Sequence, residues 1–381
     1  MGKKKTAKKR AAKKKAAKKT TATLARHCGM MEHHKYLAET DDTYQRNCRD
    51  IERFSANARL AAAPGRTTVL RIPVVVHVLH HTDEENLLLS QIESQIEALN
   101  RDYRLRNADR DDVPEPFKGF VADTLIEFAL AVRDPQGNAT TGITRTRSSI
   151  EQFPYNRFDR GAIAKLNNLI KHDEFGKAAW PRDDYLNLWV CNIQGGLLGY
   201  AAFPGEAAST DGVVINNNAF GSSGTARAPF SLGRTAVHEV GHWLNLLHIW
   251  GDDGLECSGS DNVSDTPNQA GSNGGPSITK DSFPHISCNN RPNGDMFMNY
   301  MDYVDDKVMV MFSKGQLDRM SDTLAGPRAS LAQSQGLTPV VTERVALGDQ
   351  SRTLADAVGC GAECGNRTEL VFDGVSWVPI T

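Results

Sequence analysis

The sequence of 381 residues predicts an α+β fold, and three observations support this class. Several segments are rich in β-branched and aromatic residues, and one long segment has helical spacing of its apolar side chains. The chain after residue 248 is rich in loop-forming residues. The expected strands are 70–79, 126–132, 185–193, 198–203 and 212–216.

Helices are expected at four places along the chain. Residues 23–64 look mainly helical, and residues 88–103 repeat their apolar side chains at helical spacing. A third helix follows the last expected strand and begins near Thr235, whose hydroxyl can cap its first turn. Residues 316–324 are expected to form a closing helix.

The stretch from His238 to His248 reads HEVGHWLNLLH and supplies three imidazoles and one carboxylate. Because His238 and His242 are four residues apart, they share one face of an α-helix and can reach a single metal ion. Glu239 projects about 100° away from His238, where it can touch a water beside the metal rather than the ion itself. Three neutral nitrogens with an open fourth position are typical of catalytic zinc.

The third histidine requires a bend in the chain. His248 is six residues beyond His242, and an unbroken helix would turn it to another face. Asn245 lies where the bend is needed, and Asn is one of the few non-glycine residues that tolerate a left-handed backbone. A bare HExxH pattern occurs by chance on many helices. The third histidine and the apolar surroundings favour a metal site over an exposed polar face.

The eleven residues resemble the zinc-binding motif of the metzincin peptidases. A second segment, Asp295 to Tyr303, reads DMFMNYMDY and is similar to the methionine-containing turn of that clan. The residues in and around both motifs are similar to those of the pappalysin family, and the resemblance covers about residues 66–325. That family usually has glycine in place of Asn245. The resemblance implies a twisted, mixed five-stranded sheet with a backing helix and an active-site helix over an irregular C-terminal subdomain.

The same resemblance implies a zinc endopeptidase that hydrolyses peptide bonds in proteins. Met301 would form the hydrophobic floor beneath the metal, and Tyr303 would stabilise the oxyanion. Glu239 would take a proton from the attacking water and return it to the leaving amine.

Further residues are candidates for binding the substrate or a second ion. Leu198, Gly199, Tyr200 and Ala201 are similar to the family's cleft-edge strand, which can pair with an extended peptide; an ordinary internal strand is the alternative. Asp305 is a candidate for favouring a basic residue just after the scissile bond, with a solvated acidic turn as the alternative. The resemblance also implies a structural calcium ion with Asp265 as its best candidate ligand, although Asp-rich loops often hold no ion.

Seven cysteines leave at least one unpaired in a monomer. Cys257 and Cys288 flank a loop after the histidine motif, and we expect them to form a disulfide. Cys28 lies in a segment that resembles the cysteine-switch segment of metzincin propeptides, where its thiolate would bind the zinc and keep the enzyme latent. A Cys28–Cys48 disulfide is the alternative.

Charge and composition divide the chain. Residues 1–28 hold twelve of the 44 basic residues and no acid, so the remainder carries 32 basic against 46 acidic residues. We expect four parts: a disordered Lys-rich tail at 1–22, a helical prosegment at 23–65, a metzincin-like catalytic domain at 66–329 and a C-terminal extension at 330–381.

The tail can bind polyanions through phosphate contacts, although the acidic body argues against a nucleic-acid substrate. No apolar run approaches the ~20 residues needed to cross a bilayer, and no standard secretory signal peptide follows the basic start. The expected disulfide nevertheless favours export. We therefore expect a secreted monomer made as a latent zymogen. The rival hypotheses are an inactive zinc-binding protein and a nucleic-acid-associated protein defined by its Lys-rich tail.

Overall fold

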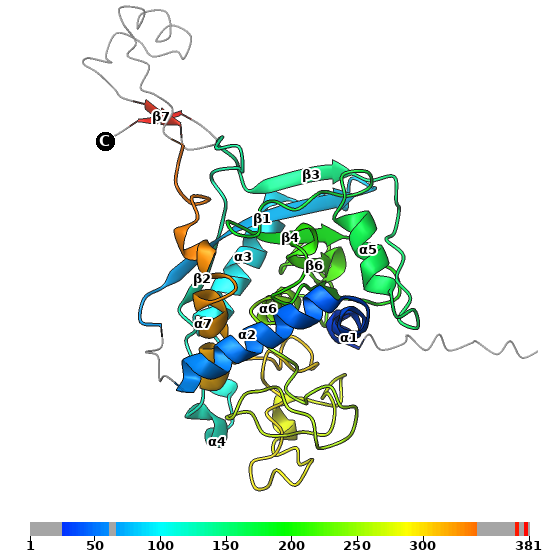
Figure 1. Ribbon diagram of the computed structural model, residues 1–381, viewed down its shortest axis with the longest axis vertical. Helices are drawn as coiled ribbons and strands as arrows, with labels where there is room; N and C mark the ends of the chain where they lie inside the picture. Colours follow the sequence, from blue (N-terminus) through cyan, green and yellow to red (C-terminus); the bar gives the residue numbers. More distant parts are fainter. Residues whose placement is uncertain (1–24, 61–65, 341–369, 373–376, 380–381) are drawn as a thin grey trace, which may run out of the picture.

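The structure is a computed structural model that describes residues 25–60, 66–340, 370–372 and 377–379 (Figure 1). The Lys-rich tail expected at 1–22 lies outside the described residues. Within the region expected as a C-terminal extension, the structure describes a small antiparallel pair, β7 (Leu370–Phe372) and β8 (Trp377–Pro379).

A mixed six-stranded sheet forms the upper part of the molecule as drawn in Figure 1. On one side β1 pairs with β4, and on its other side it pairs first with β2 and then with β3. β4 pairs with β6, and β6 pairs with β5. All neighbours are parallel except β5, which runs antiparallel to β6 and ends the order of strands. The strands are β1 (Leu70–His80), β2 (Ile126–Leu130), β3 (Ile143–Arg147), β4 (Leu186–Cys191), β5 (Gly199–Ala201) and β6 (Val213–Asn216).

The α+β class and the mixed sheet are confirmed, and the five expected strands are present. The sixth strand, β3, corrects the expected number. Its sequence ITRTR is mostly polar and has no apolar alternation that would predict a strand. It forms because β1 extends beyond β2 and offers a further stretch of main chain, from Val76 to His80, for parallel pairing.

Helices cover both faces of the sheet. On one face α3 contacts β2 and α6, and α6 contacts β5 and β6, within the larger apolar cluster. On the other face α5 packs against Leu79 and Trp189, in a second cluster. The expected backing helix is present as α3, and α5, which was not predicted, covers the second face. The helices are α1 (Met30–Thr40), α2 (Asp42–Leu60), α3 (Leu89–Tyr103), α4 (Glu115–Lys118), α5 (Ala162–Ile170), α6 (Arg234–Trp243) and α7 (Lys314–Ala325).

The N-terminal helices lie on the body of the protein. α2 contacts α7 and passes in front of α6 as viewed in Figure 1, and α1 contacts α5. Cys28, Met30 and Tyr44 are almost fully buried. The segment that precedes β1 is therefore packed onto the body and not merely tethered to it.

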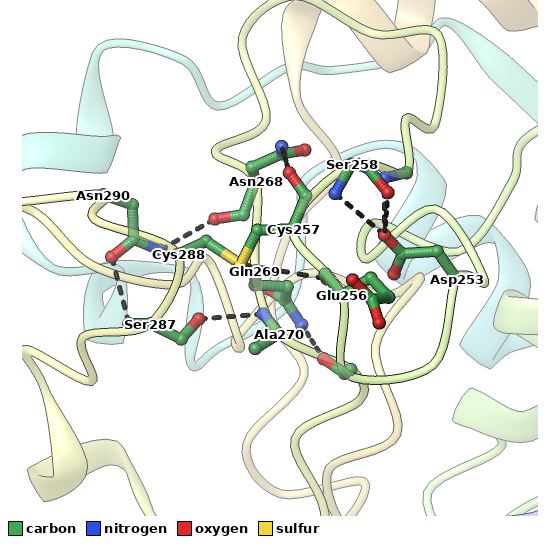
Figure 2. The surroundings of a disulfide bond; sticks show 12 residues. Asp253, Glu256, Cys257, Ser258, Asn268, Gln269, Ala270, Ser287, Cys288 and Asn290 are labelled. Carbon is green, nitrogen blue, oxygen red and sulfur yellow. Dashed lines mark hydrogen bonds between the residues drawn. A yellow bond between two sulfur atoms is a disulfide. The ribbon is translucent and has the colours of Figure 1, made fainter.

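The part of the chain between α6 and α7 is irregular. Its described backbone contains a single short helical turn, Lys280–Ser282, and otherwise loops and isolated bridges. The disulfide expected between Cys257 and Cys288 is present, with Cα atoms 5.4 Å apart (Figure 2). Asn268 lies beside it and donates a hydrogen bond from Nδ2 to the Cys257 carbonyl.

Residues just after the expected domain boundary at 329 still belong to the body. Leu331 lies in the larger apolar cluster. Farther along, Val132 N donates to the Gly336 carbonyl, and Arg133 Nε donates to the Thr338 carbonyl. Within the part of the chain that the structure describes, no helix is both long and apolar enough to span a bilayer.

Candidate active site

Helix α6 carries the first two histidines into the interior. The helix is buried along its whole length, and Gly233 precedes it with a left-handed φ of 77°. A Cβ added at Gly233 would lie 2.6 Å from Cβ of Ala98 on α3, so the turn needs glycine for close approach as well as for its backbone angle. Thr235, expected as the cap, lies inside the helix instead, where its Oγ1 accepts a hydrogen bond from Arg26.

The predicted bend lies at Asn245. Helix α6 ends at Trp243, and Asn245 has a φ of 71° in the left-handed region. Arg319 on α7 donates from Nε to the Asn245 carbonyl across 2.5 Å, which holds this turn against the closing helix. The bend returns the chain so that His248 faces the histidines of α6.

The three imidazoles converge through their Nε2 atoms. Nε2 of His242 lies 3.1 Å from Nε2 of His238 and 3.1 Å from Nε2 of His248. Each opposite nitrogen, Nδ1, is 2.7 Å from an oxygen that accepts its proton, so each Nε2 presents a lone pair. These oxygens are the carbonyls of Tyr300 and Leu246 and the carboxylate of Asp252.

This donor set fits a zinc ion. Burial lowers the pKa of His238 and His242 well below the ordinary value, and the neighbouring imidazoles lower it further, so both side chains stay neutral. Three facing lone pairs repel one another unless a cation lies between them. Nitrogens bound to zinc at about 2.0–2.1 Å in tetrahedral geometry lie about 3.3 Å apart, close to the separation found here.

Glu239 and Cys28 meet at the same point. The ligand atoms of Cys28 and the three histidines all lie within 4.8 Å of one another. The Cys28 thiol donates a hydrogen bond to Oε2 of Glu239 across 3.3 Å. Burial raises the pKa of the Glu239 carboxyl to about 8, and burial beside that carboxyl raises the pKa of the Cys28 thiol. Cys28 and Cys48 are both free, so the alternative disulfide between them is not formed.

Strand β5 forms one wall of the site and pairs with the N-terminal segment. Leu198 N donates to the His27 carbonyl, and Gly29 N donates to the Gly199 carbonyl, which gives a parallel pairing. A Cβ at Gly199 would lie 2.9 Å from Cγ of Glu239, so glycine is needed there. Tyr200 and Ala201 pair with β6, and the Tyr200 hydroxyl points away towards Asn167. Of the four expected residues, Leu198 and Gly199 therefore offer main-chain groups to the N-terminal segment.

Arg26 fills a buried pocket beside the candidate metal centre. Its Nη2 pairs with Oδ1 of Asp306 at 2.6 Å, and its Nε donates to the Val304 carbonyl at 3.2 Å. Its guanidinium also lies over the ring of Phe230. Both partners of the ion pair are essentially inaccessible to solvent. Asp305 was the expected partner for a basic side chain, but Arg26 pairs with the next residue, Asp306.

Met301 and Tyr303 lie where the methionine turn was expected to bring them. A Cβ added to Gly241 of α6 would be 2.5 Å from Sδ of Met301, so the methionine packs directly against the helix. The Tyr303 ring stands edge-on to His248, with 4.9 Å between ring centroids. Its hydroxyl donates to the Cys28 carbonyl at 3.4 Å.

Asp265 is engaged at the start of α7. One carboxylate oxygen accepts a hydrogen bond from Ser313 Oγ, and the other accepts one from Gly315 N. Among the residues that the structure describes, Cys28 and the three histidines form the only group of three or more metal-binding side chains. The calcium site expected at Asp265 therefore has no support from the structure.

Several contacts of the site were not predicted. Asp252 follows His248 by four residues, and this spacing was a usable signal for a carboxylate that orients the ring. Asp306 belongs to the same acidic run as Asp305, but sequence alone does not say which carboxylate turns inward. Arg26 contacts Asp306, 280 positions away, and Arg319 contacts Glu52, 267 positions away. No local pattern in the sequence indicates such contacts.

The chain is similar to known metallopeptidases. The family model described as Pregnancy-associated plasma protein-A matches residues 170–325. An extracellular metalloprotease of Pyricularia oryzae is 32% identical over 283 residues, which are 72% of this chain and 81% of that relative.

Two solved structures from Tannerella forsythia are also similar. Mature mirolysin in complex with a cleaved peptide is 47% identical, with a TM-score of 0.64, and the match covers 70% of this chain and 97% of that one. A promirolysin mutant is 43% identical, with a TM-score of 0.71, over 81% of this chain and 97% of that one. With the fold and the histidine cluster, these likenesses establish that the chain belongs to the pappalysin family of metzincin metallopeptidases and is a metalloendopeptidase acting on proteins or peptides.

Proposed function

We propose that this chain is a secreted zinc endopeptidase, made as a latent zymogen, that cleaves before basic residues. His238, His242 and His248 are the zinc ligands, and the convergence of their three Nε2 atoms is the observation that carries the proposal. A zinc ion held there supplies a Lewis acid that polarises the scissile carbonyl and acidifies water. Export is supported by the names of the extracellular relatives and by the disulfide.

Glu239 acts as general base and then as general acid. Its carboxyl is buried beside the histidines, within reach of a water at the metal position, and this placement supports the role of general base. It takes a proton from the attacking water and delivers it to the leaving amine. Once the prosegment has left, the hydrogen bond from Cys28 is gone and the carboxylate is free for this role.

Tyr303 stabilises the oxyanion. Its hydroxyl donates to the carbonyl of Cys28, a main-chain group of the same kind as a scissile carbonyl. A hydroxyl that already donates to a carbonyl oxygen at this position can donate more strongly as negative charge develops on that oxygen. Met301 packs beneath α6 and supports the helix that carries two of the ligands.

The N-terminal segment keeps the enzyme latent. Cys28 takes the fourth position at the metal centre, and main-chain pairing of residues 27–29 with β5 occupies the edge that a substrate would use. Removal of residues 1 to about 65 opens the site. Zinc content without turnover of any peptide would favour the rival hypothesis of an inactive zinc-binding protein.

The pocket of Arg26 takes the basic side chain that follows the scissile bond. A guanidinium paired with the buried carboxylate of Asp306 shows how such a side chain can be held. In a substrate, the basic residue in this pocket would come after the scissile bond. In the prosegment, Arg26 comes before Cys28, the residue at the metal centre. The prosegment therefore crosses the site in the direction opposite to that of a substrate.

Two experiments test the function. A peptide-library digest read by mass spectrometry, with and without chelator, should show zinc-dependent cleavage before Lys or Arg. The Glu239→Ala variant should keep its zinc and lose cleavage; normal cleavage by this variant would refute the mechanism.

Paired substitutions test the specificity pocket. Asp306→Asn should reduce the preference for basic over neutral residues about tenfold, whereas Asp305→Asn should leave it nearly unchanged. The opposite ranking would move the specificity carboxylate to Asp305.

A further inference from the structure

We propose that Arg319 and Asn245 form a carboxylate-binding subsite, which in the activated enzyme selects an acidic substrate residue before the scissile bond. This inference rests on the proposed function, because it assigns the subsite to a substrate that the metal centre cleaves.

A carboxylate already occupies this place in the precursor. Glu52 of α2 accepts hydrogen bonds from both terminal nitrogens of Arg319, Nη1 at 3.0 Å and Nη2 at 2.5 Å. Nδ2 of Asn245 adds a third contact, to Oε1 of Glu52 at 3.3 Å. Two parallel bonds from one guanidinium to one carboxylate are specific in geometry as well as charge.

The receptor and its occupant belong to different parts of the chain. Arg319 lies on α7 of the catalytic body, whereas Glu52 belongs to the prosegment. Among the described residues, Glu52 is the only carboxylate within salt-bridge distance of Arg319. The Arg319 side chain is 1% exposed beneath α2, so loss of the prosegment uncovers a guanidinium that has just lost its partner.

The subsite is held in place independently of Glu52. Nε of Arg319 donates to the carbonyl of Asn245, and the left-handed backbone of Asn245 turns its amide side chain to the same carboxylate. The pair is therefore positioned by α7 and by the bend between the zinc ligands, and both remain after activation.

A cleft of about 480 Å³ lies at this subsite, between α2 and the body of the protein. Phe203 forms part of its wall, and the Phe203 ring lies edge-on to His242 with 5.5 Å between ring centroids. The body contributes Arg319, Asn245 and Asn262 as the polar residues of the lining, and Arg319 is the charged one among them. The other lining residues from the body include Phe203, Pro204 and Leu247.

The position of the cleft identifies which substrate residues can reach it. Arg26 lies in the pocket on one side of Cys28, and the chain after Cys28 leads to α1 and α2 on the other side. If a substrate side chain after the scissile bond replaces Arg26, the residues before that bond lie over Phe203 and Arg319. Asn245 is three residues from His242, which limits the separation of their Cα atoms to about 11 Å. The acidic side chain therefore belongs to about the second to fourth residue before the bond.

Quenched fluorescent peptides test the proposal. Each peptide has Arg after the scissile bond and either Glu or its neutral isostere Gln at the second, third or fourth position before it. The enzyme is the full chain, loaded with zinc and then freed of residues 1 to about 65 by limited proteolysis. At one position we expect kcat/KM for Glu to exceed that for Gln about tenfold, mainly through KM, and the ratio should fall as salt rises.

Variants assign this preference to the two residues. Arg319→Met should abolish the Glu preference, Arg319→Lys should keep a reduced one because it keeps charge without the fork, and Asn245→Gly should lower it less than Arg319→Met. Binding of the uncut peptides to the Glu239→Ala variant, followed by fluorescence anisotropy, gives the same comparison without turnover.

The outcomes separate the two proposals. Equal rates for Glu and Gln at all three positions, in an enzyme that still prefers Arg after the bond, would overturn the subsite alone. If no peptide is cut, the proposed function fails and the subsite fails with it. If Arg319→Met does not fold, the Glu-to-Gln ratio and its salt dependence in the unmodified enzyme decide the question.

Discussion

The thiol of Cys28 donates a hydrogen bond to the carboxylate of Glu239 across 3.3 Å, although the two residues are 211 positions apart in sequence. The same sulfur lies among the three histidines. One side chain of the N-terminal segment therefore lies beside both the candidate metal ligands and the proposed general base, so Cys28 is the residue on which to test the proposed latency.

Replacing Cys28 with alanine should activate the precursor. Loss of the sulfur leaves the fourth position open and frees Glu239, so we expect the intact Cys28→Ala chain to cleave a peptide at least about tenfold faster than the intact unmodified chain. Cys48→Ala is the matched control, since Cys48 is a free thiol outside the cluster. Activity is measured before any cleavage of the chain, which gel electrophoresis verifies. Unchanged latency would assign inhibition to the rest of the prosegment.

Replacing Asp252 with asparagine should weaken metal binding. The Asp252 carboxylate accepts the Nδ1 proton of His248 at 2.7 Å and so fixes the ring with Nε2 towards the other histidines. Loss of such a partner typically costs about 10–100-fold in metal affinity. Competition with a chromogenic chelator measures the zinc affinity. Glu256→Gln, an exposed change in the same loop, should have no effect, and equal affinities for all three proteins would show that Asp252 does not orient the ring.

Two substitutions at Asn245 separate its backbone role from its side-chain role. Its φ of 71° costs a Cβ-bearing residue energy that glycine does not pay. We expect Asn245→Ala to lower the free energy of unfolding by about 1–2 kcal/mol, and Asn245→Gly to change it by less than about 1 kcal/mol. Urea denaturation of the zinc-loaded precursor measures both. Equal losses would indicate that the contact with Glu52, rather than the bend, is what the side chain supplies.

The buried His77 should make the protein less stable in acid. Burial lowers the pKa of His77 to about 4, and the hydrogen bond to Asn187 only partly opposes this. Between about pH 6.5 and pH 4 the unfolded chain therefore takes up a proton that the folded chain does not. Stability is present above this window and falls as pH falls through it, by up to about 3 kcal/mol.

Urea denaturation at intervals between pH 7 and pH 4 checks this dependence. The His77→Gln variant lacks the titrating group, so its stability should fall less steeply than that of the unmodified protein over the same window. Parallel slopes for the two proteins would exclude His77 as the source.

Local patterns predicted that the three histidines converge, because these residues lie close together in sequence. The spacing of His238 and His242, and the need for a left-handed residue at 245, follow from helix geometry alone. The apolar strands of the sheet were also found, since a strand buried on both faces reads as a continuous apolar run. In contrast, β3 is polar and depends on β1 for its pairing, so its own residues do not indicate a strand.

Contacts between distant residues could not be predicted in the same way. Asp305 and Asp306 are adjacent and chemically identical, and only tertiary contacts distinguish them: Asp306 pairs with Arg26 and accepts a hydrogen bond from Leu232 N. Thr235 looked like a helix cap because hydroxyl residues favour that position, but the left-handed Gly233 begins the helix without a side-chain cap. In each case tertiary contacts outweighed a correct local preference.

Met30 and Tyr44 lie in the segment that we propose is removed on activation, yet their side chains are among those most completely withdrawn from water. Their release would leave the apolar surface that they cover facing solvent, at a cost of about 1.5–3 kcal/mol for each large side chain. The activation that we propose would therefore also lower the stability of each molecule, and the mature enzyme would unfold sooner than its precursor.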